Sequence, residues 1–378
     1  MKILLISSTN NIQSGAGNLT HELCMFLKDK VDFTLLLPHD EKRYDYTAYN
    51  VEYILPSYIF DTRTPKIFEY LFFKYKTDAD IIHSIFEFPY ALVADRISRK
   101  NNIPLIIGLA GTYAVKPLLF FPDNFLLKRV YNHAVSMISI SKFTSDLVKK
   151  YSKTLTPIEI IHCAVNFQRF SRKYNIDDIK RKYEGKRLLM TVGALKPRKG
   201  HDIVLAALAI LKKKRNDFHY IISGDNEKRD EYIDKLDNII KYGNLEKNIT
   251  FIGSISNDDL PRYFSAIDIY IHTPIVINYN FEGFGIVYLE AGASSKPVIA
   301  SDSGGTLDAV IPDKTGLVVP EGDIEATYHA IEKLLDNDDL SKSLGEAGFQ
   351  YAKEHTWDKI GMKFLEQYKD TLNKKFNI

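Results

Sequence analysis

Apolar and polar positions alternate along the chain in blocks whose lengths predict strands and helices in turn. Short continuous apolar runs such as 2–7, 80–85 and 103–109 are typical of strands that are buried on both faces of a parallel sheet. Longer stretches such as 89–99 and 123–133 lie between these runs and predict helices. Strand and helix signals in this order predict βαβ units and an α/β fold.

The alternation stops at a charge-rich segment, 169–186, and then begins again. Further strands are expected at 187–192, 218–223, 248–252, 267–273, 297–301 and 315–319. Helices are expected to start at Ser256, whose spacing to Asp259 resembles a cap, and to cover 324–335, 340–353 and 357–373. We therefore expect two Rossmann-like doubly wound domains, at 1–168 and 169–356, that face each other across a cleft.

Length, charge and cysteine content narrow the class of protein. A chain of 378 residues suffices for about two domains, and its net charge of +2 gives no reason to expect a nucleic-acid partner. Cys24 and Cys163 have no neighbour at a metal-binding spacing, so we expect reduced thiols in a cytoplasmic protein. No segment approaches the roughly 20 apolar residues of a membrane span.

One stretch places two carboxylates, Glu282 and Glu290, eight positions apart. Glu282 lies in a glycine-flanked loop, and Glu290 lies in an apolar helical run that begins near Gly285. The unpaired N–H groups and the dipole at such a helix start attract anions. The two carboxylates can then bind a sugar and a ribose at the two ends of a diphosphate. The spacing equally fits a helix cap and a surface glutamate, and both interpretations stay open.

A basic turn follows the strand at 187–192. It contains Lys196, Arg198 and Lys199, directly before a helix. Cations at this position can neutralise a leaving diphosphate, whose negative charge grows as its bond to the sugar breaks. A solvated basic turn is the alternative. The chain shows no set of His, Asp, Glu or Cys with metal-ligand spacing, and so no metal site is predicted.

The N-terminal half offers weaker candidates at the ends of its predicted strands. The loop that holds Gly15 and Gly17 is not a dinucleotide fingerprint, and it either touches a phosphate or sugar or forms a simple turn. His83 follows a predicted strand and either contacts substrate or has a structural role. Two aromatic and basic tracts, 68–76 and 116–122, either pack partly in the core or contact a membrane or a lipid-linked or saccharide acceptor.

The chain as a whole resembles the retaining GT-B glycosyltransferases of family 4, also called glycosyltransferase group 1. The segment from Glu282 to Glu290 matches the family's E-x7-E motif. Other segments match the family's landmarks, at 191–200, 222–225, 251–254 and 297–305. The resemblance implies a GT-B fold of an N-terminal acceptor-side domain and a C-terminal donor-binding domain. It also implies that the last helix, within 357–378, packs back onto the N-terminal domain.

The resemblance also implies roles for individual residues. Glu282 and Lys199 would act in catalysis, Glu282 on the hydroxyls of the donor sugar and Lys199 on the diphosphate. Glu290 would bind the ribose. Further donor contacts would come from Arg198, Gly253, Ser254, Phe284, Gly285, Ile286, Gly15 and Gly17. Acceptor-side candidates are His83, Gly111 and Thr112.

Three features depart from the family pattern, and one of them is the stretch 273–281, which is longer than usual before Glu282. Ala194 stands where many members have an arginine, and Arg198 or Lys196 can replace it. Ala110 stands where many have a histidine near the reacting sugar, which puts the catalytic arrangement in question.

We expect a metal-independent, retaining transfer of a hexose-type sugar from a UDP- or GDP-type donor, without a further cofactor. The expected acceptor is a glycan or a lipid-linked saccharide in surface polysaccharide or lipopolysaccharide synthesis. The expected location is cytoplasmic, with a peripheral position at the inner face of the membrane as an extension. The alternatives are a non-catalytic partner subunit and another GT-B enzyme such as a sugar-nucleotide epimerase.

Overall fold

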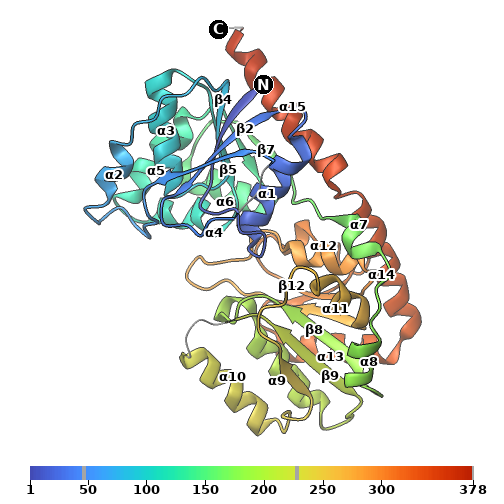
Figure 1. Cartoon of the computed structure of the whole chain (residues 1–378). Coiled ribbons are helices and arrows are strands. Elements are labelled where there is room, and N and C mark those ends of the chain that lie inside the picture. The colour runs from blue at the N-terminus through green and yellow to red at the C-terminus, as the bar shows by residue number, and fades with distance from the viewer. Residues whose placement is uncertain (45–47, 226–229, 377–378) are drawn as a thin grey trace. The chain divides into compact units, whose positions relative to one another are not determined.

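The structure is a computed structural model that describes residues 1–44, 48–225 and 230–376 (Figure 1). The chain divides into two compact units. The first comprises Met1–Ala164 together with the chain from Trp357 onward, and the second comprises Val165–Thr356. Each unit is built on its own parallel sheet, so the predicted fold class of two Rossmann-like doubly wound α/β domains is confirmed.

The first unit contains a seven-stranded parallel sheet with the order β3-β2-β1-β4-β5-β6-β7. Its strands are β1 Lys2–Ile6, β2 Asp32–Pro38, β3 Asn50–Leu55, β4 Ile81–Ser84, β5 Leu105–Leu109, β6 Ser136–Ser139 and β7 Ile158–Ile160. Its helices are α1 Gly15–Leu27, α2 Ile67–Leu71, α3 Tyr90–Asn101, α4 Thr112–Val115, η1 Lys116–Leu119, α5 Asp123–His133, α6 Lys142–Ser152 and α15 Trp357–Phe376.

The C-terminal helix α15 belongs to the core of the first unit. It lies along α1 (Figure 1). Its buried Phe364 and Leu365 share one apolar cluster with Ile3 and Leu5 of β1. Side chains two positions apart along a strand, such as those of Ile3 and Leu5, point to the same face of the sheet. The helices α1 and α15 therefore cover one face of this sheet together. Burial of this apolar stripe, at about 25 cal/mol for each Å² of apolar surface, holds the helix there.

The second unit contains a six-stranded parallel sheet with the order β10-β9-β8-β11-β12-β13. Its strands are β8 Arg187–Val192, β9 Phe218–Ser223, β10 Ile249–Phe251, β11 Ile269–His272, β12 Val298–Asp302 and β13 Leu317–Pro320. Its helices are α7 Phe167–Ser171, α8 Asp177–Lys182, η2 Pro197–Lys199, α9 His201–Leu211, α10 Glu231–Tyr242, α11 Leu260–Ala266, α12 Ile286–Ala293, η3 Thr306–Asp308, α13 Ile324–Asp336 and α14 Asp338–Lys353.

The two faces of the second sheet are covered by different helices. Ile269 and Ile271 of β11 pack in one cluster with residues of α9 and α13. Tyr270, between them in the strand, contacts the rings of Phe264 on α11 and Tyr288 on α12 instead. This alternation explains why the strand is a continuous apolar run, because both of its faces are buried.

Two expected element starts are wrong. The segment with Gly15 and Gly17 forms the first turn of α1 rather than a loop, because the Ser14 Oγ caps the helix by accepting from the Gly17 N–H. Ser256 caps a turn at Asp259, but the helix α11 begins only at Leu260. Among the described helices, none has an apolar stretch long enough to cross a bilayer.

Candidate functional site

The ends of two strands of the second unit, β8 and β11, and the loop before α12 bring a lysine, an arginine, a histidine and a glutamate together. Lys199 and Arg198 lie in η2, after β8, and His272 ends β11. The Lys199 Nζ donates to Oε2 of Glu282 at 2.5 Å, and the Arg198 Nη1 donates to the same oxygen at 3.2 Å. The His272 Nε2 lies 3.4 Å from it. The structure therefore places Glu282, Lys199 and Arg198 in one partly buried cluster around the buried His272.

Glycines that admit no side chain hold this cluster in place. A Cβ on Gly200 would lie 1.9 Å from the carbonyl oxygen of Thr273, so only glycine lets the Lys199 turn pack against the end of β11. A Cβ on Gly304 would lie 2.4 Å from the Glu282 carbonyl oxygen. The Gly305 N–H donates to that same oxygen at 2.8 Å. The glycine pair after β12 thus fixes the backbone of Glu282.

Electrostatics keep Glu282 ionised. Burial raises the pKa of this carboxyl, but Lys199, His272 and Arg198 outweigh burial and hold the pKa well below its usual range. Burial lowers the pKa of His272 to about 4, so its imidazole is neutral at pH 7. A neutral His272 can donate from Nε2 to the carboxylate, and among the described atoms its buried Nδ1 has no partner.

Burial also lowers the pKa of Lys199, and the Glu282 carboxylate opposes this shift. The ammonium is thus a buried cation that depends on an anion for its stability. Removing one partner of such a pair leaves an uncompensated charge, at a cost of about 3–5 kcal/mol. Lys199 can therefore also bind a second anion of higher charge than the Glu282 carboxylate.

The helix α12 starts beside this pair without a side-chain cap. Gly285, the residue before the helix, has a φ of 85° and, as a glycine, has no side chain that could cap the helix. A Cβ on Gly285 would lie 2.5 Å from the Tyr288 ring, whose hydroxyl donates to the His272 carbonyl oxygen at 2.8 Å. The Phe284 side chain is buried, and Ile286 is the first helical residue. This helix start can bind an anion through its N–H groups and its dipole.

Glu290 lies one turn further along α12 and is buried. Burial raises its pKa to about 7, and Arg169 of α7 partly offsets this effect. The Tyr270 phenol is close enough to both glutamates for each carboxylate to raise its pKa, although burial contributes most. Neither Tyr270 nor His272 was among the predicted site residues.

The predicted residues Gly253 and Ser254 follow β10, two strands away from β8 at the same edge of the sheet. The Gly253 carbonyl oxygen accepts from the Gly224 N–H at 3.0 Å and from the Ser223 hydroxyl at 3.1 Å. Ser254 is exposed. These bonds tie the ends of β9 and β10 together and leave the Cα of Gly253, with a φ of 64° and open space around it, accessible.

The first unit corrects the role expected of Gly17. This glycine is buried, and a Cβ on it would lie 2.2 Å from the Asn11 carbonyl oxygen. Gly17 is thus needed for the chain to pack on itself, and it does not present its backbone to a ligand. Gly15 is exposed, with nothing within 4 Å of the position of a Cβ, and remains a candidate.

His83 is also corrected, because the structure gives it a structural role. It is 1% exposed, and its Nδ1 lies 2.8 Å from the hydroxyl of Tyr368 on α15. Burial lowers its pKa to about 3, so the ring is neutral. A contact with an acceptor is not open to it; the histidine instead links β4 to the C-terminal helix.

A carboxyl that sequence reasoning missed lies at the end of the strands β4 and β5. Glu87 is buried, and its Oε2 accepts from the N–H of Ala110 at 3.0 Å. Burial raises its pKa to about 7. The predicted residues Gly111, with a φ of 129°, and Thr112 follow directly and begin α4. The sequence carried one signal for this buried carboxyl, because Glu87 is flanked by Phe86 and Phe88.

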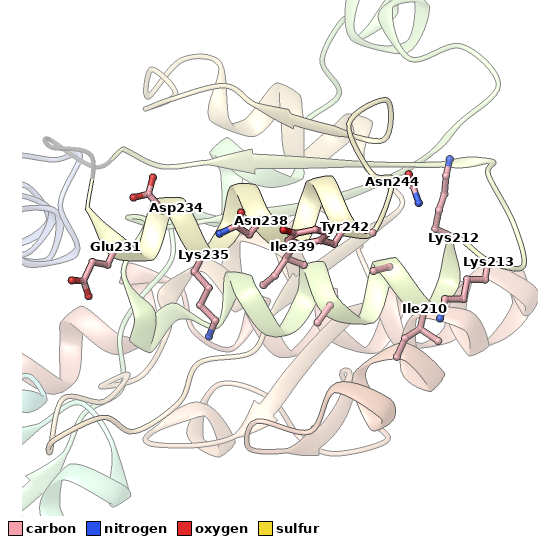
Figure 2. Close-up of a pocket in the computed structure, with 13 residues that line it drawn as sticks. Ile210, Lys212, Lys213, Glu231, Asp234, Lys235, Asn238, Ile239, Tyr242 and Asn244 are labelled. Carbon is pink, nitrogen blue, oxygen red and sulfur yellow. The ribbon is translucent and has the colours of Figure 1, made fainter.

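A groove of about 890 Å³ lies between α9 and α10 (Figure 2). It is lined by side chains such as Ile210, Lys235, Ile239 and Tyr242. None of the predicted site residues lines it. Among the described residues, no group of three or more His, Cys, Asp or Glu could hold a metal ion.

Two doubly wound α/β units, one with a cation–carboxylate cluster beside a helix start, are an arrangement typical of α/β enzymes. Residues 173–351 match the family model described as glycosyl transferases group 1, and residues 13–169 match the model described as glycosyltransferase family 4. The chain therefore belongs to the group 1 glycosyltransferases and is a glycosyltransferase of the GT-B fold.

Relatives agree with this family. An uncharacterised glycosyltransferase of Methanocaldococcus jannaschii is 28% identical over 291 residues, which cover 77% of this chain and 75% of that protein. The GDP-mannose-dependent alpha-(1-6)-phosphatidylinositol monomannoside mannosyltransferase of Mycobacterium tuberculosis is 29% identical over 181 residues, which cover 47% of this chain and 46% of that protein. The latter match spans about half the length of each protein.

Solved structures share the fold. The sucrose-phosphate synthase of Thermosynechococcus elongatus has a TM-score of 0.82 at 20% identity, with 99% of this chain and 100% of that chain covered. The HepE protein of Anabaena, in complex with UDP and glucose, has a TM-score of 0.79 at 18% identity, with 98% and 100% covered. At these identities the likeness concerns the fold.

Proposed function

We propose that this chain transfers a hexose-type sugar from a nucleoside diphosphate sugar to a saccharide or lipid-linked acceptor, with retention of anomeric configuration and without a metal ion. The observation that carries the proposal is the contact between Lys199 and Glu282 beside the open start of α12. A cation and free N–H groups suit a diphosphate, and a buried ionised carboxylate suits sugar hydroxyls.

The donor residues divide between the two ends of this ligand. Lys199 and the N–H groups of Gly285 and Ile286 receive the diphosphate, and Arg198 supplies the second cation in place of Ala194. When the diphosphate binds, the contact between Lys199 and Glu282 weakens. The Glu282 oxygens then accept hydrogen bonds from the hydroxyls of the sugar. Glu290, in the second turn of α12, receives the ribose hydroxyls. Gly253 and Ser254 border the nucleobase.

The transfer step needs no protein nucleophile. The bond between the anomeric carbon and the leaving phosphate oxygen breaks, and the acceptor oxygen forms its bond to the same face of that carbon. The acceptor proton passes to the leaving phosphate oxygen. Lys199 and the helix N–H groups stabilise the negative charge that develops on the diphosphate, which is the largest contribution expected from a preorganised site.

The donor that we propose carries either UDP or GDP as its nucleotide. The mycobacterial relative is GDP-mannose-dependent, whereas the Anabaena neighbour was crystallised with UDP. The acceptor we propose is a growing surface glycan or a lipid-linked saccharide in polysaccharide or lipopolysaccharide synthesis, used at the cytoplasmic face of a membrane. The aromatic and basic surface of the first unit supports an acceptor at a membrane.

A panel of UDP-, GDP- and ADP-sugars tests the proposal. We expect one donor to raise the melting temperature of the protein and to release free nucleotide when an extract with the native acceptor is added. If no donor changes the melting temperature, the donor site is disproved. Ala110 and Ala194 favour a second candidate, a non-catalytic partner subunit, and binding without transfer or hydrolysis would support it.

A further inference from the structure

The first unit exposes an unusual number of phenylalanine side chains. Six of the seven exposed phenylalanines among the described residues lie between positions 60 and 125, and the seventh is Phe251 in the other unit. We call these six the phenylalanine surface: Phe60, Phe68, Phe72, Phe120, Phe121 and Phe125, with exposed fractions of 51–80%. Large exposed apolar groups of this kind mark a surface that contacts another phase or molecule.

A buried hydrogen bond joins the two segments that carry the surface. Asp123, at the start of α5, accepts from the Thr62 N–H at 2.9 Å and also from the Thr62 hydroxyl. Both residues are buried. Phe60 lies two positions before Thr62, and Phe121 and Phe125 lie two positions to either side of Asp123. The bond therefore ties together the two segments that carry these three exposed rings.

The short helix α2 extends the surface from the same loop. Its Phe68 stacks on Phe72 with ring centroids 6.1 Å apart, and both rings are exposed. Ile67 and Tyr70 of the same helix are buried. The helix is thus held by its buried side and presents aromatic rings on the other, where a helix in water would present polar groups.

Basic side chains accompany the rings. Residues 60–76 and 116–129 each carry a net charge of +2. Arg63, Lys66 and Lys74 are exposed, and the carboxylate of Asp61 is paired with Arg63 at 3.0 Å. Glu69 is the exposed carboxylate that opposes them. Aromatic rings with basic neighbours are the combination that lies in the interface of an anionic bilayer.

The surface adjoins the strand ends of its own sheet. Its segments follow the carboxyl ends of β3 and β5, the edge at which open parallel sheets bind ligands. The Tyr58 ring contacts Phe60 at 5.3 Å and Tyr113 at 6.2 Å between centroids. Tyr113 is the neighbour of the acceptor-side candidate Thr112. A bilayer under the phenylalanine surface would therefore lie next to these strand-end loops.

We propose that the phenylalanine surface docks on a bilayer of anionic phospholipid. The rings enter the interface of the bilayer, and the basic side chains pair with its headgroups. The idea that docking serves a lipid-linked acceptor rests on the proposed function, but docking itself does not. Vesicle binding is measured without donor or acceptor, so a failure of docking and a failure of sugar transfer are distinguishable.

The test is sedimentation of the full chain with vesicles of phosphatidylglycerol and phosphatidylcholine in equal parts, and with phosphatidylcholine alone. We expect binding to the anionic vesicles that weakens as salt is added, and weak binding to the neutral ones. The double variant Phe121→Asp, Phe125→Asp should bind the anionic vesicles at least about tenfold more weakly. The double variant Lys66→Glu, Lys74→Glu should lose most of the preference for anionic vesicles.

Leu155→Asp is the matched control. Leu155 is 97% exposed in the same unit, outside the phenylalanine surface, and its replacement should leave vesicle binding unchanged. The proposal is overturned if the native chain does not bind anionic vesicles. It is also overturned if the Phe121→Asp, Phe125→Asp variant binds these vesicles as tightly as the native chain. A native chain that forms dimers through these rings, and binds no vesicles, would identify the surface as a contact between copies instead.

Discussion

At the scale of single residues, the site depends on groups whose charges are set by burial and by one another. Glu282 is ionised because three neighbours outweigh its burial, and Lys199 stays charged largely because of Glu282. His272 completes the cluster as a neutral donor. The glutamates and the basic turn were predictable because their types and spacing carry the signal. His272, Tyr270 and Glu87 were not, because their roles arise only where strand ends meet.

Lys199→Ala should lower the turnover number by roughly a hundredfold or more, because the lysine stabilises charge that develops in the transition state. The free energy of unfolding should also fall, but by less than the about 3–5 kcal/mol of a buried pair that loses all compensation, since Arg198 still faces Glu282. Lys213→Ala, an exposed lysine of the same unit, is the control. Steady-state kinetics with the donor found in the panel measure the effect. Unchanged turnover in Lys199→Ala would remove this residue from the proposed mechanism.

Glu290→Ala should weaken nucleotide binding by about 10- to 100-fold, the loss expected for charge-assisted hydrogen bonds to two ribose hydroxyls. Titration calorimetry with the nucleoside diphosphate measures this affinity. The exposed Glu325→Ala serves as the matched change on α13 of the same unit. If the affinity of Glu290→Ala equals that of the native chain, the ribose is bound elsewhere.

At the scale of elements, strands were predicted well because burial on both faces leaves a continuous apolar run in the sequence. The connection between β8 and α9 was predicted as a basic turn before a helix. Its shape was not predictable, because it depends on the contact between Gly200 and Thr273. The start of α1 was mispredicted because the cap at Ser14 draws the glycines into the helix. The delayed start of α11 at Leu260 places Pro261 in its first turn, where a missing N–H costs nothing.

The turn after β12 gives a prediction at this scale. Gly304 and Gly322 have similar positive φ values, 61° and 76°, but a Cβ on Gly304 would strike the Glu282 carbonyl oxygen and one on Gly322 would meet nothing. Gly322→Ala should cost about 1 kcal/mol for its left-handed backbone alone. Gly304→Ala should cost more and should also raise the KM for the donor, because Glu282 must move.

Thermal unfolding and donor kinetics on both variants test this prediction. Equal losses of stability, with the donor KM unchanged in both, would show that the glycine pair does not position Glu282.

At the scale of the whole molecule, the division into two doubly wound units follows from the restart of the strand and helix pattern. The charged segment 169–186, which was expected to end the crossover between the domains, contains α8 and the end of α7 near the start of the second unit. The two units share one electrostatic feature. Each holds a buried carboxyl, Glu87 in the first and Glu290 in the second, whose pKa burial raises to about 7.

These carboxyls link stability to pH. In the unfolded chain each ionises near its ordinary pKa of 4.5, and in the folded chain near 7. Between these values the folded protein binds more protons, so this contribution to the free energy of unfolding is complete below 4.5 and is lost as the pH rises through 7. Buried histidines with lowered pKa values, such as His83 and His272, act in the opposite direction between about 4 and 6.5.

A comparison with single variants separates the two effects. Glu87→Gln and Glu290→Gln keep the shape of a protonated carboxyl but do not ionise. Each should therefore melt close to the native chain at pH 5 and above it at pH 8, by a few degrees, since one pKa unit corresponds to about 1.4 kcal/mol. Glu325→Gln, on an exposed side chain, should match the native chain at both pH values. A variant of Glu87 or Glu290 that melts no higher than the native chain at pH 8 would mean that its carboxylate is already stabilised in the fold, by partners such as the Ala110 N–H or Arg169.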